Sequence, residues 1–244
     1  MRFSLAAVLV ASGLLLAGCG GGGSGSSFGS LKGETPTEIL ALTTTAITTN
    51  GFSFHFIDES TVGTRSSTLT GDDTAAGSDQ TLSGSVAALT VERRSDGRVY
   101  VEGAAPALES SLGLSATMAT AHAGQWISLQ PGDSPYRAVT AALAPKAELD
   151  AFIPRPPFTL VAPREFHGRT VVGVSGRPQP SAANGTGHLD TIFVPTEAPY
   201  TPVGATLTFG SGSSAGIEAV VFNRWGQRTD PAVPTGVVAF SSLG

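Results

Sequence analysis

The sequence predicts an α+β domain in which an antiparallel β-sheet carries helices on one face. The predicted elements run in the order helix, strands, helices, strands, whereas parallel sheets alternate strands with helices. The turn Ser95, Asp96, Gly97 is short enough to join two neighbouring strands directly. From residue 158 onward, glycines and prolines divide the chain into short strands. These three observations favour a long antiparallel meander over a parallel sheet.

The first residues have the pattern of an exported lipoprotein. Arg2 precedes an apolar stretch that is shorter than the roughly 20 residues a membrane-spanning helix needs. The stretch ends in the tetrapeptide LAGC, and its last residue, Cys19, is the only cysteine of the chain. We therefore expect residues 1–18 to be a signal peptide and the Cys19 thiol to accept the lipid. The alternative is a buried or free thiol at Cys19.

A flexible tether is expected next, at residues 19–33. Seven glycines and four serines occupy residues 20–33, a composition that cannot bury enough apolar surface to fold. Two or three acyl chains on Cys19 would hold the protein at the cell membrane, on its extracytoplasmic face. Residues 34–244 have the length of a single domain. The formal net charge of −5 argues against a nucleic-acid partner.

The first half of the domain predicts one helix and several strands. Residues 35–50 should form the helix, because Thr35, Pro36 and Glu38 have the spacing of a helix start. Gly51 can end this helix. Alternation of apolar and polar residues predicts a strand directly afterwards, and a long polar loop is expected at residues 71–80. The strands expected in this half cover residues 52–57, 81–88, 89–94 and 98–102.

The middle of the chain changes to helical spacing before strands return. Residues 106–123 predict a helix that is interrupted near Gly113. Residues 125–129 alternate as a strand, and Pro135 can then start a helix that carries Val139 and Leu143. A second short helix is expected through Leu149 and Phe152. The strands expected beyond it cover residues 158–162, 169–175, 188–194, 203–209 and 217–223.

Three phenylalanines, Phe52, Phe54 and Phe56, fall on one face of the first predicted strand. Each covers about 150 to 250 Å², so together they exceed the contiguous apolar surface that soluble monomers expose. They must therefore be covered. The pattern leaves two alternatives open, an ordinary core and the lining of a ligand cavity.

The sequence gives little support for catalysis. Residues 212–216, GSSAG, match the nucleophile pattern G-x-S-x-G, but they form a hairpin-like stretch before a strand instead of the required turn between strand and helix. The four histidines lack the spacing of a zinc site. Asp72 and Asp73 lack the twelve-residue ligand spacing of a calcium loop. We expect neither enzymatic activity nor a cofactor or metal ion.

Three stretches of the chain resemble actinobacterial lipoproteins of the LppX/LprG group. Residues 97–129 read GRVYVEGAAPALESSLGLSATMATAHAGQWISL, and residues 136–143 read YRAVTAAL. The closing stretch, residues 219–234, reads AVVFNRWGQRTDPAVP. With the LAGC tetrapeptide, the resemblance spans most of the chain beyond Cys19, by pattern and order of segments.

The resemblance implies a LolA-like half-barrel, a curved antiparallel sheet with helices packed on its concave face. It also implies an apolar cavity between sheet and helices, which in several relatives takes up acylated lipids. We expect a lipoprotein that binds or transfers a lipid or glycolipid without catalysis, with a membrane transporter or envelope protein as a further partner. The alternative is a non-catalytic envelope interaction protein of the same fold with a filled core. The cavity walls would come from Phe52, Phe54, Phe56, Leu112, Met118, Trp126, Val139 and Leu143.

Overall fold

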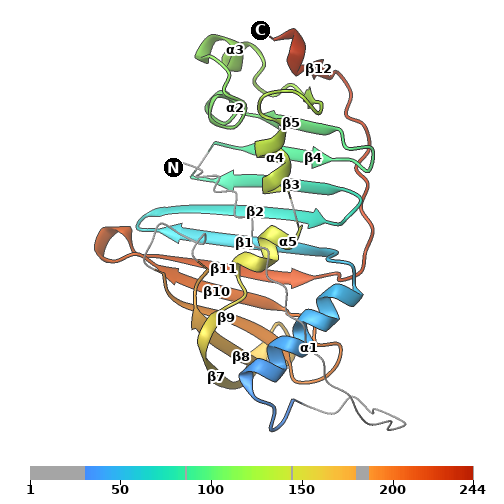
Figure 1. Ribbon diagram of the computed structural model, residues 1–244. Coiled ribbons are helices and arrows are strands. Elements are labelled where there is room, and N and C mark those ends of the chain that lie inside the picture. Colours follow the sequence, from blue (N-terminus) through green and yellow to red (C-terminus); the bar gives the residue numbers. More distant parts are fainter. Residues whose placement is uncertain (1–30, 86, 144, 180–186, 244) are drawn as a thin grey trace.

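The protein is a mixed α+β structure built on one large, curved and unclosed β-sheet (Figure 1). The computed structural model describes residues 31–85, 87–143, 145–179 and 187–243. Twelve strands form the sheet, and all neighbours pair antiparallel except β12 and β6, which pair parallel. The predicted α+β class is confirmed. The predicted signal peptide, Cys19 and most of the predicted tether lie outside the described residues.

The sheet order follows the chain closely, except that β1 lies beside β11 and β12 lies beside β6. From one edge to the other, the strands are β12 (Val238–Ala239), β6 (Ile127–Leu129), β5 (Val99–Gly103), β4 (Leu89–Arg93), β3 (Ser78–Gly84), β2 (Arg65–Asp73), β1 (Phe54–Val62), β11 (Gly216–Asn223), β10 (Gly204–Phe209), β9 (Gly187–Pro195), β8 (Arg169–Arg177) and β7 (Arg155–Phe166). The helices are α1 (Pro36–Thr49), α2 (Ala105–Leu112), α3 (Ala116–Ala121), α4 (Tyr136–Ala142) and α5 (Pro145–Ala151). Two short 3₁₀ turns, Gly212–Ser214 and Phe240–Ser242, complete the described elements.

Helix α1 starts as the sequence predicts. The Thr35 hydroxyl accepts a bond from the Glu38 N–H at 3.4 Å, and the Thr35 N–H donates to Glu38 Oε2 at 2.8 Å. Five threonines of this helix donate their hydroxyl protons to carbonyls four residues earlier, so they stay compatible with the helical backbone: Thr43, Thr44, Thr45, Thr48 and Thr49. Leu31, which was expected in the tether, is 6% exposed and packs in the core. The folded part thus begins earlier than the predicted boundary at residue 34.

The sequence pattern does not predict strand β2. Residues 71–80 were expected to form a long polar loop, but β2 continues to Asp73 and β3 begins at Ser78. β2 reads RSSTLTGDD, which carries one large apolar side chain, Leu69, and therefore lacks the alternation that marks a strand. Its position between β1 and β3 supplies backbone hydrogen bonds on both sides. Sheet context, not side-chain pattern, makes this segment a strand.

Two apolar clusters lie on the same face of the sheet, which we call the helix-bearing face. Register shows this, because Phe54 pairs with Asp73, Asp73 with Ser78, Ser78 with Arg93, and Arg93 with Val99. Directly paired residues share a face. The α1 cluster comprises Leu31, Ile39, Ile47, Phe54, Phe56, Leu149, Phe152, Val172, Val174, Ile192, Val194, Tyr200, Ala205, Leu207, Val220 and Phe222. The α2 cluster comprises Val91, Val99, Val101, Leu108, Leu112, Ala119, Ile127, Leu129, Val139, Leu143 and Leu243.

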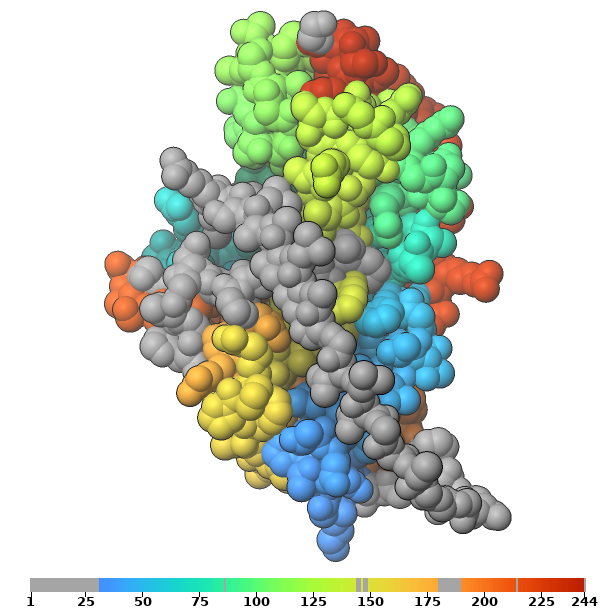
Figure 2. Space-filling view, in the orientation of Figure 1, coloured from blue at the N-terminus to red at the C-terminus, as the bar shows by residue number. Residues whose placement is uncertain are grey.

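The helices divide the coverage of this face between them. Helix α1 packs on the half that contains β7 to β11, and α2 and α3 lie at the β5 and β6 end (Figure 1). Helices α4 and α5 lie between these two regions, with α4 contributing to the α2 cluster and α5 to the α1 cluster. In the space-filling view, α4 (yellow-green) and α1 (blue) are visible from the same side (Figure 2).

The C-terminal segment after β11 runs along the ends of the strands to the far edge of the sheet (Figure 1). Its Asp230 accepts hydrogen bonds from the Ser95 backbone N–H at 3.1 Å and the Ser95 hydroxyl at 2.9 Å. The segment then adds β12 beside β6, where the Val238 N–H donates to the Trp126 carbonyl at 2.8 Å. The last residues therefore tie one half of the sheet to the other.

Replacing Thr35 with alanine should destabilise the domain by about 1 kcal/mol, because the helix start loses its side-chain cap. Thr44→Ala is the matched control, since the exposed Thr44 hydroxyl bonds only the Leu40 carbonyl and alanine favours helix. We expect that variant to be as stable as the parent or slightly more so. Urea unfolding followed by circular dichroism measures both. Equal losses in the two variants would contradict the assigned cap.

Candidate functional site

The structure distributes the predicted cavity residues over two packed clusters instead of around one trough. Phe54 and Phe56 are 0% exposed in the α1 cluster, and Phe52 packs at its margin. Leu112, Val139 and Leu143 are buried in the α2 cluster, with Met118 at its margin, and Trp126 is half-buried outside both clusters. The two clusters are separate because polar side chains occupy the sheet face between them.

Aromatic side chains fill the α1 cluster around Phe54. The Phe54 ring lies 5.4 Å from Phe222, edge to face, and 5.1 Å from Trp225. The Trp225 indole N–H donates to the Pro202 carbonyl at 3.0 Å, which fixes the ring. The sequence pattern includes Trp225 in the closing stretch but does not predict its contact with Phe54. Its position follows from the backbone bond of Gly226 N–H to the Ser53 carbonyl at 2.8 Å, which only the fold reveals.

A band of four polar side chains crosses the helix-bearing face between the clusters. We call this set, Asp73, Ser78, Gln80 and Arg93, the polar band. The Gln80 amide donates to both Asp73 carboxylate oxygens, at 3.0 and 3.2 Å. Arg93 donates to the Thr74 carbonyl at 3.0 Å and to the Ser78 hydroxyl at 3.4 Å. These bonds satisfy most of the polar atoms that the sheet and helices remove from water.

The polar band also fixes the end of helix α4. The Ser78 hydroxyl donates to the Leu143 carbonyl at 3.1 Å, just after the last turn of α4. At the start of the same helix, the Tyr136 hydroxyl donates to the Gly97 carbonyl at 2.8 Å. Helix α4 is thus held over the sheet by side-chain hydrogen bonds at its two ends and by the packing of Val139 and Leu143.

Two buried carboxyl groups on this face have raised pKa values. Burial raises the pKa of Asp73 to about 6, although bonds from Ser78 and Gln80 and the charge of Arg93 act in the opposite direction. Burial, followed by the charge of Glu218, raises the pKa of Asp190 to about 8. Both groups are therefore more easily protonated in the folded chain than in the unfolded chain.

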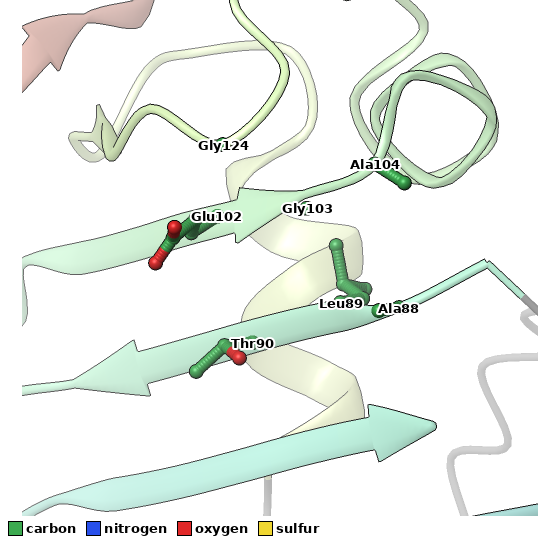
Figure 3. Close-up of a pocket in the computed structure, with 7 residues that line it drawn as sticks. All are labelled: Ala88, Leu89, Thr90, Glu102, Gly103, Ala104 and Gly124. Carbon is green, nitrogen blue, oxygen red and sulfur yellow. The ribbon is translucent and has the colours of Figure 1, made fainter. Parts of the chain in front are cut away.

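A shallow hollow of about 320 Å³ lies at the ends of β4 and β5, next to the loop before β6 (Figure 3). None of the eight predicted cavity residues lines it. Gly103 allows the close approach of the neighbouring chain, since a Cβ there would lie 2.9 Å from the Ala88 carbonyl oxygen and 2.9 Å from a Leu89 methyl group. Its lining residues are Ala88, Leu89, Thr90, Glu102, Gly103, Ala104 and Gly124.

The described residues provide no metal centre and no membrane-spanning helix. In residues 31–243, apart from the two internal gaps of one residue and the gap at 180–186, no group of three or more His, Cys, Asp or Glu side chains could hold a metal ion. Over the same part of the chain, no helix combines the length and apolar character needed to cross a bilayer.

The fold defines a class of protein, a mixed α+β structure with a curved, unclosed sheet. Short helices cover the apolar, helix-bearing face of this sheet. Comparison with known proteins adds little. No family model matches the chain, and no curated protein matches it. The complex of MucA and MucB from Pseudomonas aeruginosa is similar at 15% identity and a TM-score of 0.34, over 86% of this chain and 60% of that chain. A DUF1329 family protein from Desulfovibrio piger is similar at 8% identity and a TM-score of 0.26, over 76% and 91%.

Truncation of Phe54 tests how completely the α1 cluster is filled. Phe54→Ala should lower the free energy of unfolding by about 3 to 5 kcal/mol, because the ring is fully buried among other aromatic rings. Ile57→Ala is the control on the opposite face of the same strand, where the side chain is 36% exposed, and should cost about 1 kcal/mol. Denaturant unfolding measures both. A loss for Phe54→Ala no larger than that of the control would indicate a loosely packed cluster.

The raised pKa values predict stability that falls as pH rises. An acid whose pKa is higher in the folded chain than in the unfolded chain favours the folded state when it is protonated. This contribution to stability is complete at a pH below the unfolded pKa, and it is lost as the pH rises through the folded pKa. The stability that Asp190 contributes is lost between about pH 4 and about pH 8, and the stability that Asp73 contributes is lost between about pH 4 and about pH 6. Each loss amounts to at most about 1.4 kcal/mol of unfolding free energy per pH unit. Asp190→Asn should remove the Asp190 contribution to the fall in stability between about pH 4 and about pH 8. Asp73→Asn should change the pH dependence of stability only below about pH 6. Thermal melts from pH 4 to 9 measure this, and a parent whose stability rises with pH would contradict both assignments.

Proposed function

We propose that this chain is a non-catalytic, lipid-anchored envelope protein that takes up the acyl part of a lipid between its sheet and helices. The observation that carries the proposal is the helix-bearing face, on which apolar side chains from eight strands form two buried clusters. An acyl chain requires a continuous apolar surface and few polar groups. The half-barrel arrangement, with the helices on the concave face, is part of the proposal.

Helices α4 and α5 are the segment that would move to admit a ligand. Each has seven residues and neither pairs with a strand of the described sheet, so α4 is tied to the sheet through the side-chain bonds of Ser78 and Tyr136 described above. Val139 of α4 and Leu143 directly after it belong to the α2 cluster. Leu149 of α5 and Phe152 directly after it belong to the α1 cluster. Displacing these side chains would join the clusters into one trough across the polar band. The predicted wall residues Phe54, Phe56 and Leu112 would then lie along its two halves.

The rest of the proposed role concerns location and partners. An acylated Cys19 would keep the domain beside the cell membrane on its extracytoplasmic side, because two or more acyl chains hold a protein firmly in a bilayer. A lipid or glycolipid would be the ligand, and a membrane transporter or another envelope protein would deliver or receive it. The net charge of −5 is consistent with anchoring by acyl chains instead of attraction to anionic lipid.

One observation favours a second function, a protein-binding envelope lipoprotein of the same fold with a permanently filled interior. Phe54 and Phe56 are completely buried against protein side chains such as Phe222, and no predicted cavity residue lines the hollow at β4 and β5. In that case the helices would stay closed and binding would occur at loops or strand edges.

Lipid extraction from the protein purified from its native host distinguishes the two functions. We expect mass spectrometry to find a stoichiometric lipid in the Cys19→Ala chain, in which no acyl anchor contributes to the extract. Phe54→Ala should change the amount or the chain length of the bound lipid, because it enlarges the apolar face. Ile57→Ala, on the opposite face, should leave the bound lipid unchanged. An extract without lipid from the folded protein would overturn the proposal and leave the filled-core function.

A further inference from the structure

Three carboxyl groups border the α1 cluster on the helix-bearing face. We call Asp58 of β1, Glu218 of β11 and Asp190 of β9 the carboxyl cluster. Glu218 pairs with Leu207 of β10, and Leu207 pairs with Asp190, so the three residues lie on one face of neighbouring strands. Glu218 and Asp58 also share a side-chain hydrogen bond, and the charge of Glu218 acts on Asp190. Three acidic residues that are distant in sequence thus meet in one place.

Asp190 carries the strongest indication that this cluster receives a ligand. Its side chain is 0% exposed, and both carboxylate oxygens are buried without a hydrogen bond from any described side chain. The backbone N–H of Thr191 offsets part of the burial cost, but the pKa remains raised to about 8. A buried carboxyl group without a partner side chain is costly, so native proteins normally provide one. No ion pair between described residues involves Asp190.

The chemistry of the cluster selects the ligand that would fit it. Carboxyl groups repel phosphate, sulfate and carboxylate heads, and an attractive partner must donate hydrogen bonds or carry positive charge. A metal ion is excluded for the described residues, which hold no metal-binding group of three acidic, histidine or cysteine side chains. An organic ammonium group donates several hydrogen bonds and compensates the charge of carboxylates that would otherwise repel each other.

We propose that the carboxyl cluster binds the cationic head of an amphiphile whose hydrocarbon chain lies on the α1 cluster, a proposal that rests on the proposed lipid uptake. The spacing along the strands supports it. Asp58 follows Phe56 by two residues, Asp190 precedes Ile192 by two, and Glu218 precedes Val220 by two. Residues two apart on a strand are neighbours on the same face. A chain in van der Waals contact with Phe56, Ile192 and Val220 therefore ends at the carboxyl cluster.

Three ten-carbon amphiphiles with different heads test the proposal on the whole chain carrying Cys19→Ala. Decylammonium, decanol and decanoate share the same hydrocarbon chain and differ in charge. Trp225, which packs against Phe54 and Phe222, reports occupancy of the α1 cluster by its fluorescence. Isothermal titration calorimetry confirms the stoichiometry. We expect decylammonium to bind about tenfold more tightly than decanol and decanoate to bind most weakly, since a tenfold ratio needs only about 1.4 kcal/mol.

The double variant Asp190→Asn, Glu218→Gln should remove the preference for the ammonium head while keeping the binding of decanol. Asp79→Asn is the matched control, because burial also raises the pKa of Asp79, but Asp79 lies on the opposite face, paired with Asp72. It should keep the preference. Equal affinity for all three heads, or a preference that survives the double variant, would overturn the cationic-head proposal and leave lipid uptake standing. Failure of all three amphiphiles to bind would overturn both.

Discussion

Side-chain alternation along the antiparallel pairing of the strands from β8 to β6 is the constraint on which this structure depends. Each strand from β8 to β6 places every second residue on the helix-bearing face, and direct pairing carries that choice from strand to strand. Because Phe54 and Phe56 must be buried, the face on which they lie is the face that the helices cover. A shift of one residue in β1 would expose both rings and bury His55 and Ile57 instead. The positions of the polar band and the carboxyl cluster follow from the same register.

The polar band explains why this face carries two cores instead of one. Asp73, Ser78, Gln80 and Arg93 occupy part of the sheet face between the two clusters. Their mutual hydrogen bonds limit the cost of burial, yet the Arg93 Nε has no partner among the described residues and the pKa of Asp73 stays raised. Each half of the sheet therefore has its own helices. The segment that contains α4 and α5 contributes side chains to both clusters.

Helix caps, glycine breaks and side-chain alternation made most helices and strands predictable. The strands that could not be predicted depend on pairing with their neighbours in the sheet. The cap at Thr35, the break at Gly113 and the alternation around Phe54 each act within a few residues, so they can be read from sequence. β2 and β12 could not be predicted, because the first lacks apolar alternation and the second has two residues held by β6. For the site, burial of the phenylalanines follows from their pattern. The carboxyl cluster does not, since its three acids come from strands whose pairing no local pattern specifies. Cys19 and the signal peptide stay predictions.

The closed interior and the proposed uptake of a lipid are energetically compatible. Helices α4 and α5, with seven residues each, are shorter than the roughly 12 residues at which isolated helices become stable in water. Packing of Val139, Leu143, Leu149 and Phe152 therefore holds them, at about 1.5 to 3 kcal/mol for each side chain, or about 6 to 12 kcal/mol together. A hydrocarbon chain of about ten methylene groups contributes about 8 kcal/mol on the same surface, at about 0.8 kcal/mol each. Because these contributions are similar, the ligand's head group can decide which occupant covers the sheet.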